Sequence, residues 1–210
     1  MLRYPKKLKA MTLVEMMVAI AISLIAMEGL TYLFLKTWDT NKFILEEGMA
    51  SAAASRATNK IVIQLRAAQQ SDNGDYPIES GDDFEVVFYG DIDNDGVVEK
   101  VHYFLDLATD QLKLGVSNPL ATNPVTYPVT DDVVSVVTNY VVNDATDPTF
   151  YYYNGDYPND TINNPMATPV AVGAIRMIRV RLFVNINPVH APDNIHIESF
   201  VDLRNLNTYE

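Results

Sequence analysis

One uninterrupted apolar stretch near the amino terminus constrains this chain more than any other feature. Residues 16–35 read MMVAIAISLIAMEGLTYLFL, and Ser23, Glu28 and Thr31 are the few polar interruptions. Twenty residues form a helix about 30 Å long, which matches the thickness of the hydrocarbon core of a bilayer. A helix that is apolar on every side needs lipid or other protein around it. The stretch therefore predicts a segment that spans a membrane.

The charge distribution around this stretch predicts its orientation. Residues 1–10 contain four basic side chains and no acid, whereas the whole chain has 15 basic and 27 acidic residues and a net charge of −12. Basic residues beside an apolar segment remain on the cytoplasmic side of the membrane. We therefore expect a cytoplasmic amino terminus and an acidic extracytoplasmic body. An acidic body repels phosphate backbones, so we expect no nucleic-acid partner.

The composition also argues against an enzyme. The chain has no cysteine and only three histidines, and it contains no HExxH or GxSxG motif. The lack of cysteine excludes disulfides, thiolate catalysis and zinc–sulfur sites. A hydrophobic content of 48% nevertheless provides enough material for a folded core. We therefore expect a folded, non-enzymatic body without a nucleophile–base pair.

Three interpretations of the amino-terminal segment compete. A secretory signal peptide needs a small-residue cleavage site after the apolar region, but Lys36, Thr37, Trp38 and Asp39 follow it. A plain membrane anchor leaves Glu15, at the edge of the apolar run, without an explanation. The third interpretation accounts for it, because the sequence KKLKA–MTLVEMMVAIAI at residues 6–22 closely resembles the class III signal of the type IV pilin and pseudopilin family.

This resemblance implies specific processing. Prepilin peptidase would cut between Ala10 and Met11, and Met11 would become the N-methylated first residue of the mature chain. Glu15 would then be the fifth mature residue, and its carboxylate would pair with the terminal amine of a neighbouring subunit. In the family the residue before the cut is usually glycine and the first mature residue is commonly phenylalanine, so Ala10 and Met11 are variants of the pattern. The alternative is an uncleaved anchor in which Glu15 is incidental.

The rest of the chain predicts a long helix followed by strands, an α+β plan. Residues 36–70 contain no proline and are rich in alanine, so we expect the helix to run from 11 to 70. We divide the chain into a leader (1–10), a transmembrane or filament-core helix (11–35), a helix continuation packed on the body (36–72) and an antiparallel β-rich domain (73–210). The predicted strands cover residues 84–90, 97–106, 111–116, 132–143, 149–154, 174–186 and 196–205.

The β-rich body resembles the body of a J-type minor pseudopilin of type II secretion or a W-type minor pilin, with residues 101–105, 174–180 and 201–205 carrying the likeness. The resemblance implies a structural, assembly-priming tip subunit of a pseudopilus or pilus. Its partners would be other major and minor pilins, prepilin peptidase, and the inner membrane with its assembly platform. A second hypothesis is a pilin-like adhesin or ligand-binding module that presents residues 149–160, including Tyr151, Tyr152 and Tyr153, to a surface or glycan.

An acidic loop is the one candidate metal site. Residues 91–99 read DIDNDGVVE, so Asp91, Asp93 and Asp95 alternate before Gly96, and Glu99 follows. Calcium prefers six to eight hard oxygen ligands, which carboxylates and a backbone carbonyl provide. The first six positions match an EF-hand loop, whereas the twelfth is His102 and the flanks predict strands. We consider both a calcium loop between two strands and a plain Asp-Gly hairpin turn with solvated acids.

Overall fold

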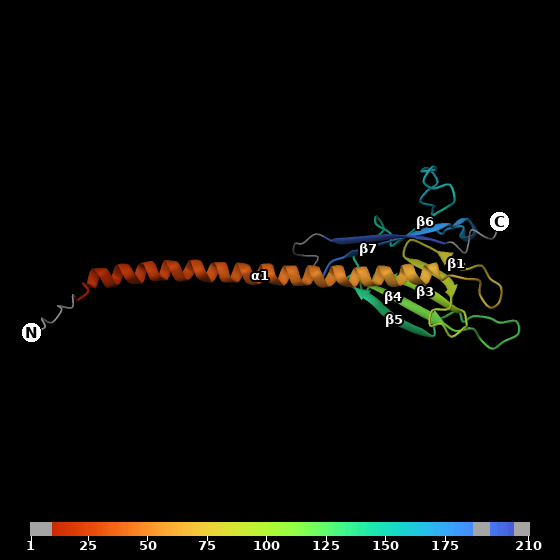
Figure 1. Ribbon diagram of the computed structural model, residues 1–210, viewed down its shortest axis with the longest axis horizontal. Helices are drawn as coiled ribbons and strands as arrows, with labels where there is room; N and C mark the ends of the chain where they lie inside the picture. Colours follow the sequence, from red (N-terminus) through yellow and green to blue (C-terminus); the bar gives the residue numbers. More distant parts are fainter. Residues whose placement is uncertain (1–9, 187–193, 204–210) are drawn as a thin grey trace, which may run out of the picture. The chain divides into compact units, whose positions relative to one another are not determined.

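The computed structural model describes residues 10–186 and 194–203, and the chain divides into two compact units, residues 1–45 and 46–210. One helix, α1 (Leu13–Arg66), belongs to both units (Figure 1). In the described part of the chain, eight strands and one short 3₁₀ helix follow it. A long helix before antiparallel sheets confirms the predicted α+β fold. The leader lies almost entirely outside the described residues.

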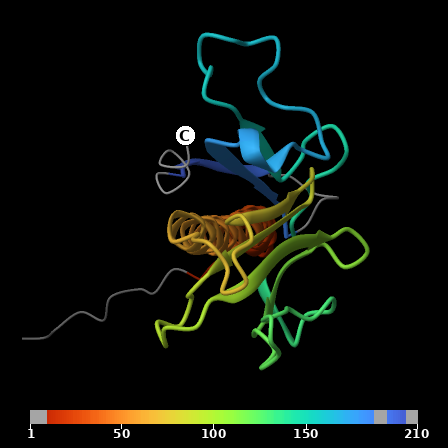
Figure 2. The same ribbon diagram turned by 90° about the vertical axis from the view of Figure 1, so that its right-hand side faces the viewer.

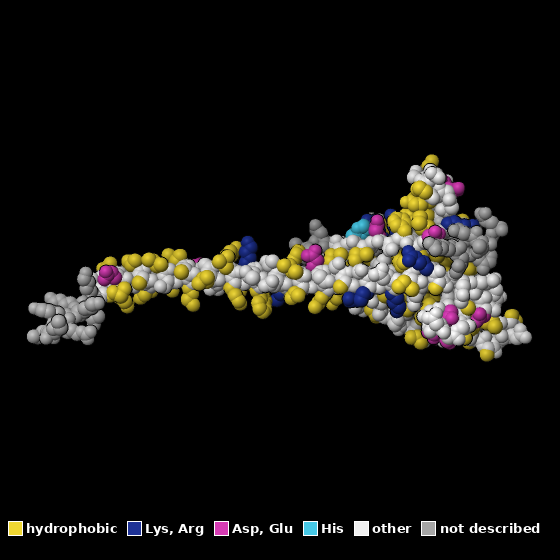
Figure 3. Space-filling model, in the orientation of Figure 1, with side chains coloured by type: hydrophobic (Ala, Val, Ile, Leu, Met, Phe, Trp, Pro, Cys, Tyr) yellow, Lys and Arg dark blue, Asp and Glu magenta, His cyan; other side chains and the backbone are white. Residues whose placement is uncertain are grey.

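In the first unit, residues 13–45 of α1 expose apolar side chains on all sides. Leu24 is 63% exposed and Phe34 is 65% exposed, and the other large apolar residues of this segment are similar. Figure 3 shows these hydrophobic side chains along the visible face of the helix. By length and composition α1 is able to cross a membrane. Because the described residues leave these side chains exposed, they require lipid or other subunits around them.

In the second unit, residues 46–66 of α1 form part of the core. Its buried face has the spacing of three or four residues that a helix requires, and the members of that face are Ala50, Ala54, Ala57, Thr58, Ile61, Val62 and Leu65. This part of the helix lies between two sheets (Figure 2). The alanines, Ile61 and Leu65 belong to the same buried cluster as side chains from the strands.

The larger sheet is an antiparallel meander in which each strand pairs with the next. Burial alternates strictly in its third strand, where every second side chain is buried. Period-two burial places one face of the sheet against the helix and leaves the other to solvent. The strands are β1 (Ile78–Gly81), β2 (Glu85–Gly90), β3 (Glu99–Asp106), β4 (Gln111–Ser117) and β5 (Val133–Asn139).

The smaller sheet has the order β6-β7-β8 and is also antiparallel. Its strands are β6 (Phe150–Tyr153), β7 (Met177–Val184) and β8 (Ile195–Asp202), and the 3₁₀ helix η1 (Val172–Ala174) precedes β7. The alternation predicted for residues 174–186 is present in β7, where Ile178, Val180 and Leu182 are buried. Arg179 and Arg181 lie on the opposite face, as their spacing predicts.

The structure refines the predicted β-domain in two ways. The strands form two sheets rather than one, because the chain leaves the first sheet after β5 and pairs with the second through the isolated bridge between Val141 and Val184. The strand predicted over 132–143 ends at Asn139, since Tyr140 has a left-handed backbone with φ of 62°. Asn143 then holds the segment after β5 against the second sheet. Its Oδ1 accepts from the Phe183 amide at 2.9 Å, and its Nδ2 donates to the Arg181 carbonyl at 3.0 Å.

The boundaries also differ from the predicted ones. The helix ends at Arg66 instead of residue 70, and the strand predicted from residue 97 begins at Glu99, because residues 97 and 98 belong to the preceding loop. The short strand β1 was not predicted, since Pro77 and Asp82 bracket only four residues. The strand predicted over 196–205 is observed as Ile195–Asp202, and its final two residues lie outside the described part of the chain.

Candidate functional site

The amino-terminal end of α1 is closed by reciprocal hydrogen bonds between Thr12 and Glu15. The Glu15 Oε2 atom accepts from the Thr12 amide at 2.8 Å and from the Thr12 hydroxyl at 2.9 Å. The Thr12 Oγ1 atom accepts from the Glu15 amide at 3.3 Å. This arrangement is a capping box, which satisfies amides that have no partner inside the helix. Sequence reasoning singled out Glu15 for its charge and missed the cap, although the spacing T-x-x-E signals it.

The predicted processing point lies immediately before this cap. Ala10 and Met11 are both exposed and precede the first helical residue, and Met11 is 64% exposed. A peptide bond in extended backbone outside a helix is open to a protease. Residues 1–9 lie outside the described part of the chain. Cleavage and methylation at this bond remain predictions.

The acidic loop joins β2 to β3 and brings its four predicted ligands together. One carboxylate oxygen from each of Asp91, Asp93, Asp95 and Glu99 lies within 4.8 Å of the others. Two residues in left-handed conformations curl the loop, Asn94 with φ of 63° and Gly96 with φ of 89°. Asparagine and glycine tolerate this region better than other residues. The turn that Gly96 was expected to allow is therefore present.

Backbone amides hold three of these carboxylates in place. The Gly96 amide donates to Asp91 Oδ2 at 3.1 Å, the Asp95 amide to Asp93 Oδ1 at 3.2 Å, and the Val97 amide to Asp95 Oδ1 at 2.8 Å. The bonds of Asp93 and Asp95 are Asx turns, in which an acid accepts from the amide two residues later, whereas the bond of Asp91 reaches across the loop to an amide five residues later. Each aspartate keeps a second oxygen. Hydrogen bonds to the backbone therefore orient the carboxylates of the loop, and the calcium site stays a prediction.

Glu99 closes the loop from the protein side. It is the first residue of β3 and is 2% exposed. Its Oε2 accepts from the Ile92 amide at 2.8 Å, whereas its Oε1 has no hydrogen-bond partner among the described residues. Burial raises the pKa of Glu99, the Ile92 hydrogen bond opposes that effect, and the negative charges of Asp93 and Asp91 add to it. Asp91 Oδ1 is likewise buried and without a partner in the described chain.

The three tyrosines proposed as a ligand platform pack into the second sheet. Tyr152 is fully buried and Tyr153 is 3% exposed. Tyr151 is partly buried, and its ring lies 4.0 Å from the Arg179 guanidinium carbon, a cation–π distance. Strand packing therefore accounts for this run, and it does not form an exposed aromatic surface.

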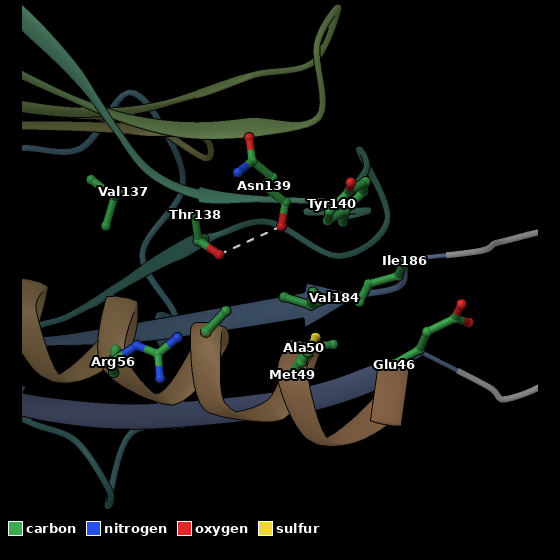
Figure 4. A pocket seen from close by; sticks show the side chains of 11 residues that line it. Glu46, Met49, Ala50, Arg56, Val137, Thr138, Asn139, Tyr140, Val184 and Ile186 are labelled. Carbon is green, nitrogen blue, oxygen red and sulfur yellow. Dashed lines mark hydrogen bonds between the residues drawn. The ribbon is translucent and has the colours of Figure 1, made fainter. Parts of the chain in front are cut away.

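A hollow of about 580 Å³ in the second unit had no sequence signal (Figure 4). It lies between residues 46–56 of α1, the end of β5 and the end of β7. Its lining is largely aliphatic, with Met49, Val137, Val184 and Ile186, and Glu46 and Arg56 add one charge of each sign. These segments are far apart in sequence, so only the fold brings them together.

Comparison with known protein families finds a motif at the amino terminus. Residues 5–27 match the prokaryotic N-terminal methylation motif, a span that includes Ala10, Met11 and Glu15. The amino-terminal segment thus carries the processing signal that type IV pilin-like proteins share. The motif and the apolar helix together support a membrane-anchored chain, and a signal of this class implies processing by prepilin peptidase and assembly with other pilins. Neither the comparison with curated proteins nor that with solved structures gave a match.

Proposed function

We propose that this pilin-like protein is a minor subunit that primes or caps a type II secretion pseudopilus or a type IV pilus. One observation carries the proposal: the methylation motif at residues 5–27 runs into a helix whose residues 13–45 expose apolar side chains on every side. Such a surface is satisfied by lipid before assembly and by neighbouring pilin helices after it. The function is therefore structural, and binding between helices replaces catalysis.

The capped end of α1 gives this assembly a chemical mechanism. After cleavage, Met11 would carry a free and then methylated amine, four residues before Glu15. A carboxylate in an apolar environment is costly without a cationic partner. Glu15 Oε2 is already turned toward Thr12 at the end of the helix. The amine of a neighbouring subunit would neutralise the carboxylate and fix the axial position of one helix against the next.

A position at the tip is supported by the shape of the chain within each unit. The helix α1 has no proline after the apolar stretch and remains continuous to Arg66. The second unit is large for a subunit that must repeat along a thin filament, because two sheets enclose the helix. A subunit placed once, at the tip, has no such constraint. The adhesin alternative loses its main support, because Tyr152 and Tyr153 are buried.

We propose that the protein waits in the inner membrane with its amino terminus in the cytoplasm and its second unit in the periplasm. The basic residues of the first ten positions, beside the apolar stretch, support this orientation. Its partners are other major and minor pilins and the assembly platform in that membrane.

Co-purification tests this function. The full chain, tagged at its carboxyl end, is extracted from membranes in mild detergent, and the associated proteins are identified by mass spectrometry. We expect other proteins that begin with the same methylation motif. Glu15→Gln is the matched variant, since it keeps the size of the side chain and removes its charge. Recovery of the protein without any such partner would contradict the proposal.

A further inference from the structure

The acidic loop has the arrangement of donors that a cation site needs. Asp91, Asp93, Asp95 and Glu99 occupy alternate positions, and their carboxylate oxygens lie within 4.8 Å of one another. Val97 continues the same alternation between Asp95 and Glu99 and offers a backbone oxygen. Like charges this close repel each other strongly. A turn that served only to reverse the chain would not gather four of them.

A second observation points independently to a ligand. Glu99 is 2% exposed and its Oε1 atom has no hydrogen-bond partner among the described residues. Asp91 Oδ1 is also buried and has no hydrogen-bond partner among the described residues. A buried carboxylate oxygen is strongly disfavoured unless a hydrogen bond or a positive charge compensates it. The two oxygens without partners belong to Glu99 and Asp91, which are members of the same cluster of four acids. A single positive charge in that cluster would therefore compensate both.

The described part of the chain does not provide that charge. Within residues 10–186 and 194–203, no lysine, arginine or histidine forms an ion pair with the four carboxylates. Lys100 is adjacent to Glu99 in sequence, but its ammonium group pairs with Glu79 at 2.8 Å. Neighbouring residues on a strand point to opposite faces, so Lys100 cannot reach into the loop. The missing cation has to come from solution.

We propose that the loop binds one calcium ion through the carboxylates of Asp91, Asp93, Asp95 and Glu99 and the backbone oxygen of Val97. All five donors are oxygen, which excludes the softer metals that prefer nitrogen or sulfur. Five protein oxygens leave room for one or more waters in the six- to eightfold shell of calcium. Magnesium retains several waters and is usually held by one or two carboxylates, so it suits this loop poorly.

The contacts around the loop show what the ion would stabilise. The Val98 amide donates to Asp72 Oδ2 at 3.4 Å, and the Tyr127 hydroxyl donates to the Val98 carbonyl at 2.8 Å. Tyr127 also accepts from the Asp72 amide at 3.2 Å. Val98 therefore links three segments: the turn after α1, the start of β3 and the long connection before β5. Calcium would lock this junction in a domain that has no disulfide.

The experiment measures calcium binding and thermal unfolding of the full chain in detergent after metal removal. We expect saturable binding of one calcium ion, and a rise in Tm of about 5–10 °C at 100 times the Kd. Asp93→Asn keeps an acceptor for the Asp95 amide and loses one charge, so it should bind at least tenfold more weakly. Asp144→Asn is the matched control, because Asp144 lies in an exposed turn and also accepts from a backbone amide, that of Thr146. This variant should bind calcium as the natural chain does.

Glu99→Gln separates a metal ligand from a merely structural acid. In chelator this variant should unfold at the same or a higher temperature than the natural chain, because it removes a buried charge. In calcium the order should reverse. Three results would overturn the proposal. They are a Tm of the natural chain that does not change with calcium, equal calcium affinities of Asp93→Asn and Asp144→Asn, or an equal rise in Tm with magnesium. A higher Tm of Glu99→Gln under all conditions would likewise overturn it.

Discussion

The hydroxyl of Tyr152 on β6 donates to the backbone oxygen of Glu85 on β2 at 2.8 Å, and this contact connects the two sheets. The same hydroxyl lies 3.1 Å from the Asp82 backbone oxygen, in the turn before β2. Tyr152 is fully buried, so water cannot replace either contact. The second unit is thus held together by a polar contact between its sheets as well as by the helix between them.

Removing that hydroxyl should destabilise the second unit. Tyr152→Phe leaves the Glu85 and Asp82 carbonyls without this donor, and a lost buried hydrogen bond costs about 1–3 kcal/mol. Urea unfolding of the detergent-solubilised protein measures the change. Tyr151→Phe is the control, because its ring packs against Arg179 at the partly exposed face, and we expect a change below about 0.5 kcal/mol. Equal effects of the two variants would contradict a role for the hydroxyl.

Alkaline pH should unfold the protein through its buried tyrosines. Burial raises the pKa of Tyr152 and of Tyr103 above the ordinary value of 10. The folded chain therefore retains protons that the unfolded chain loses above pH 10. Stability should be independent of these groups below pH 10 and fall as the pH rises above it. Parallel unfolding curves and phenolate absorbance against pH test this, and phenolate formation at these sites without unfolding would contradict it.

A methyl group at Gly81 should disturb the same region. A Cβ atom there would lie 2.7 Å from two ring carbons of Tyr152 and 2.8 Å from a methyl carbon of Val170. Such contacts require the buried ring to move, so Gly81→Ala should cost about 1–3 kcal/mol. Gly173→Ala is the control, since no atom lies within 4 Å of its added carbon. Urea unfolding measures the free energies of unfolding of both variants. Equal values would contradict the expected clash between the added carbon and the Tyr152 ring.

Local sequence patterns predicted the features of the fold that depend on residues close together in the chain. Alternation along β7 placed Ile178 and Val180 in the core, and the absence of proline predicted the continuous helix. The division into two sheets depends on Tyr140 and Asn143, whose backbone conformation and contacts across the fold leave no periodic signal. The four acids of the loop were identified as a group, whereas the burial of Glu99 depends on packing that only the folded chain reveals.

The mature protein should begin at Met11. Prepilin peptidase would remove residues 1–10, so mass spectrometry of the membrane-extracted protein should detect an N-methylated Met11 at the amino terminus. The motif match over residues 5–27 supports this. Ala10→Lys should block cleavage, because a long charged side chain replaces a small one beside the cut. A natural chain that begins at Met1 would contradict the prediction.

Assembly should depend on the charge of Glu15 more than on its role in the helix cap. Glu15→Gln can still accept from the Thr12 amide and hydroxyl, but it cannot neutralise an amine. Thr12→Val retains the carboxylate and loses the hydroxyl that accepts from the Glu15 amide, at a cost of about 1 kcal/mol to the helix end. We therefore expect Glu15→Gln to reduce co-purification with other pilins at least tenfold and Thr12→Val to reduce it much less. The amount of each variant in the membrane is the control for folding and insertion. A larger loss in Thr12→Val than in Glu15→Gln would assign the role of this end of the helix to capping and would contradict pairing with an amine.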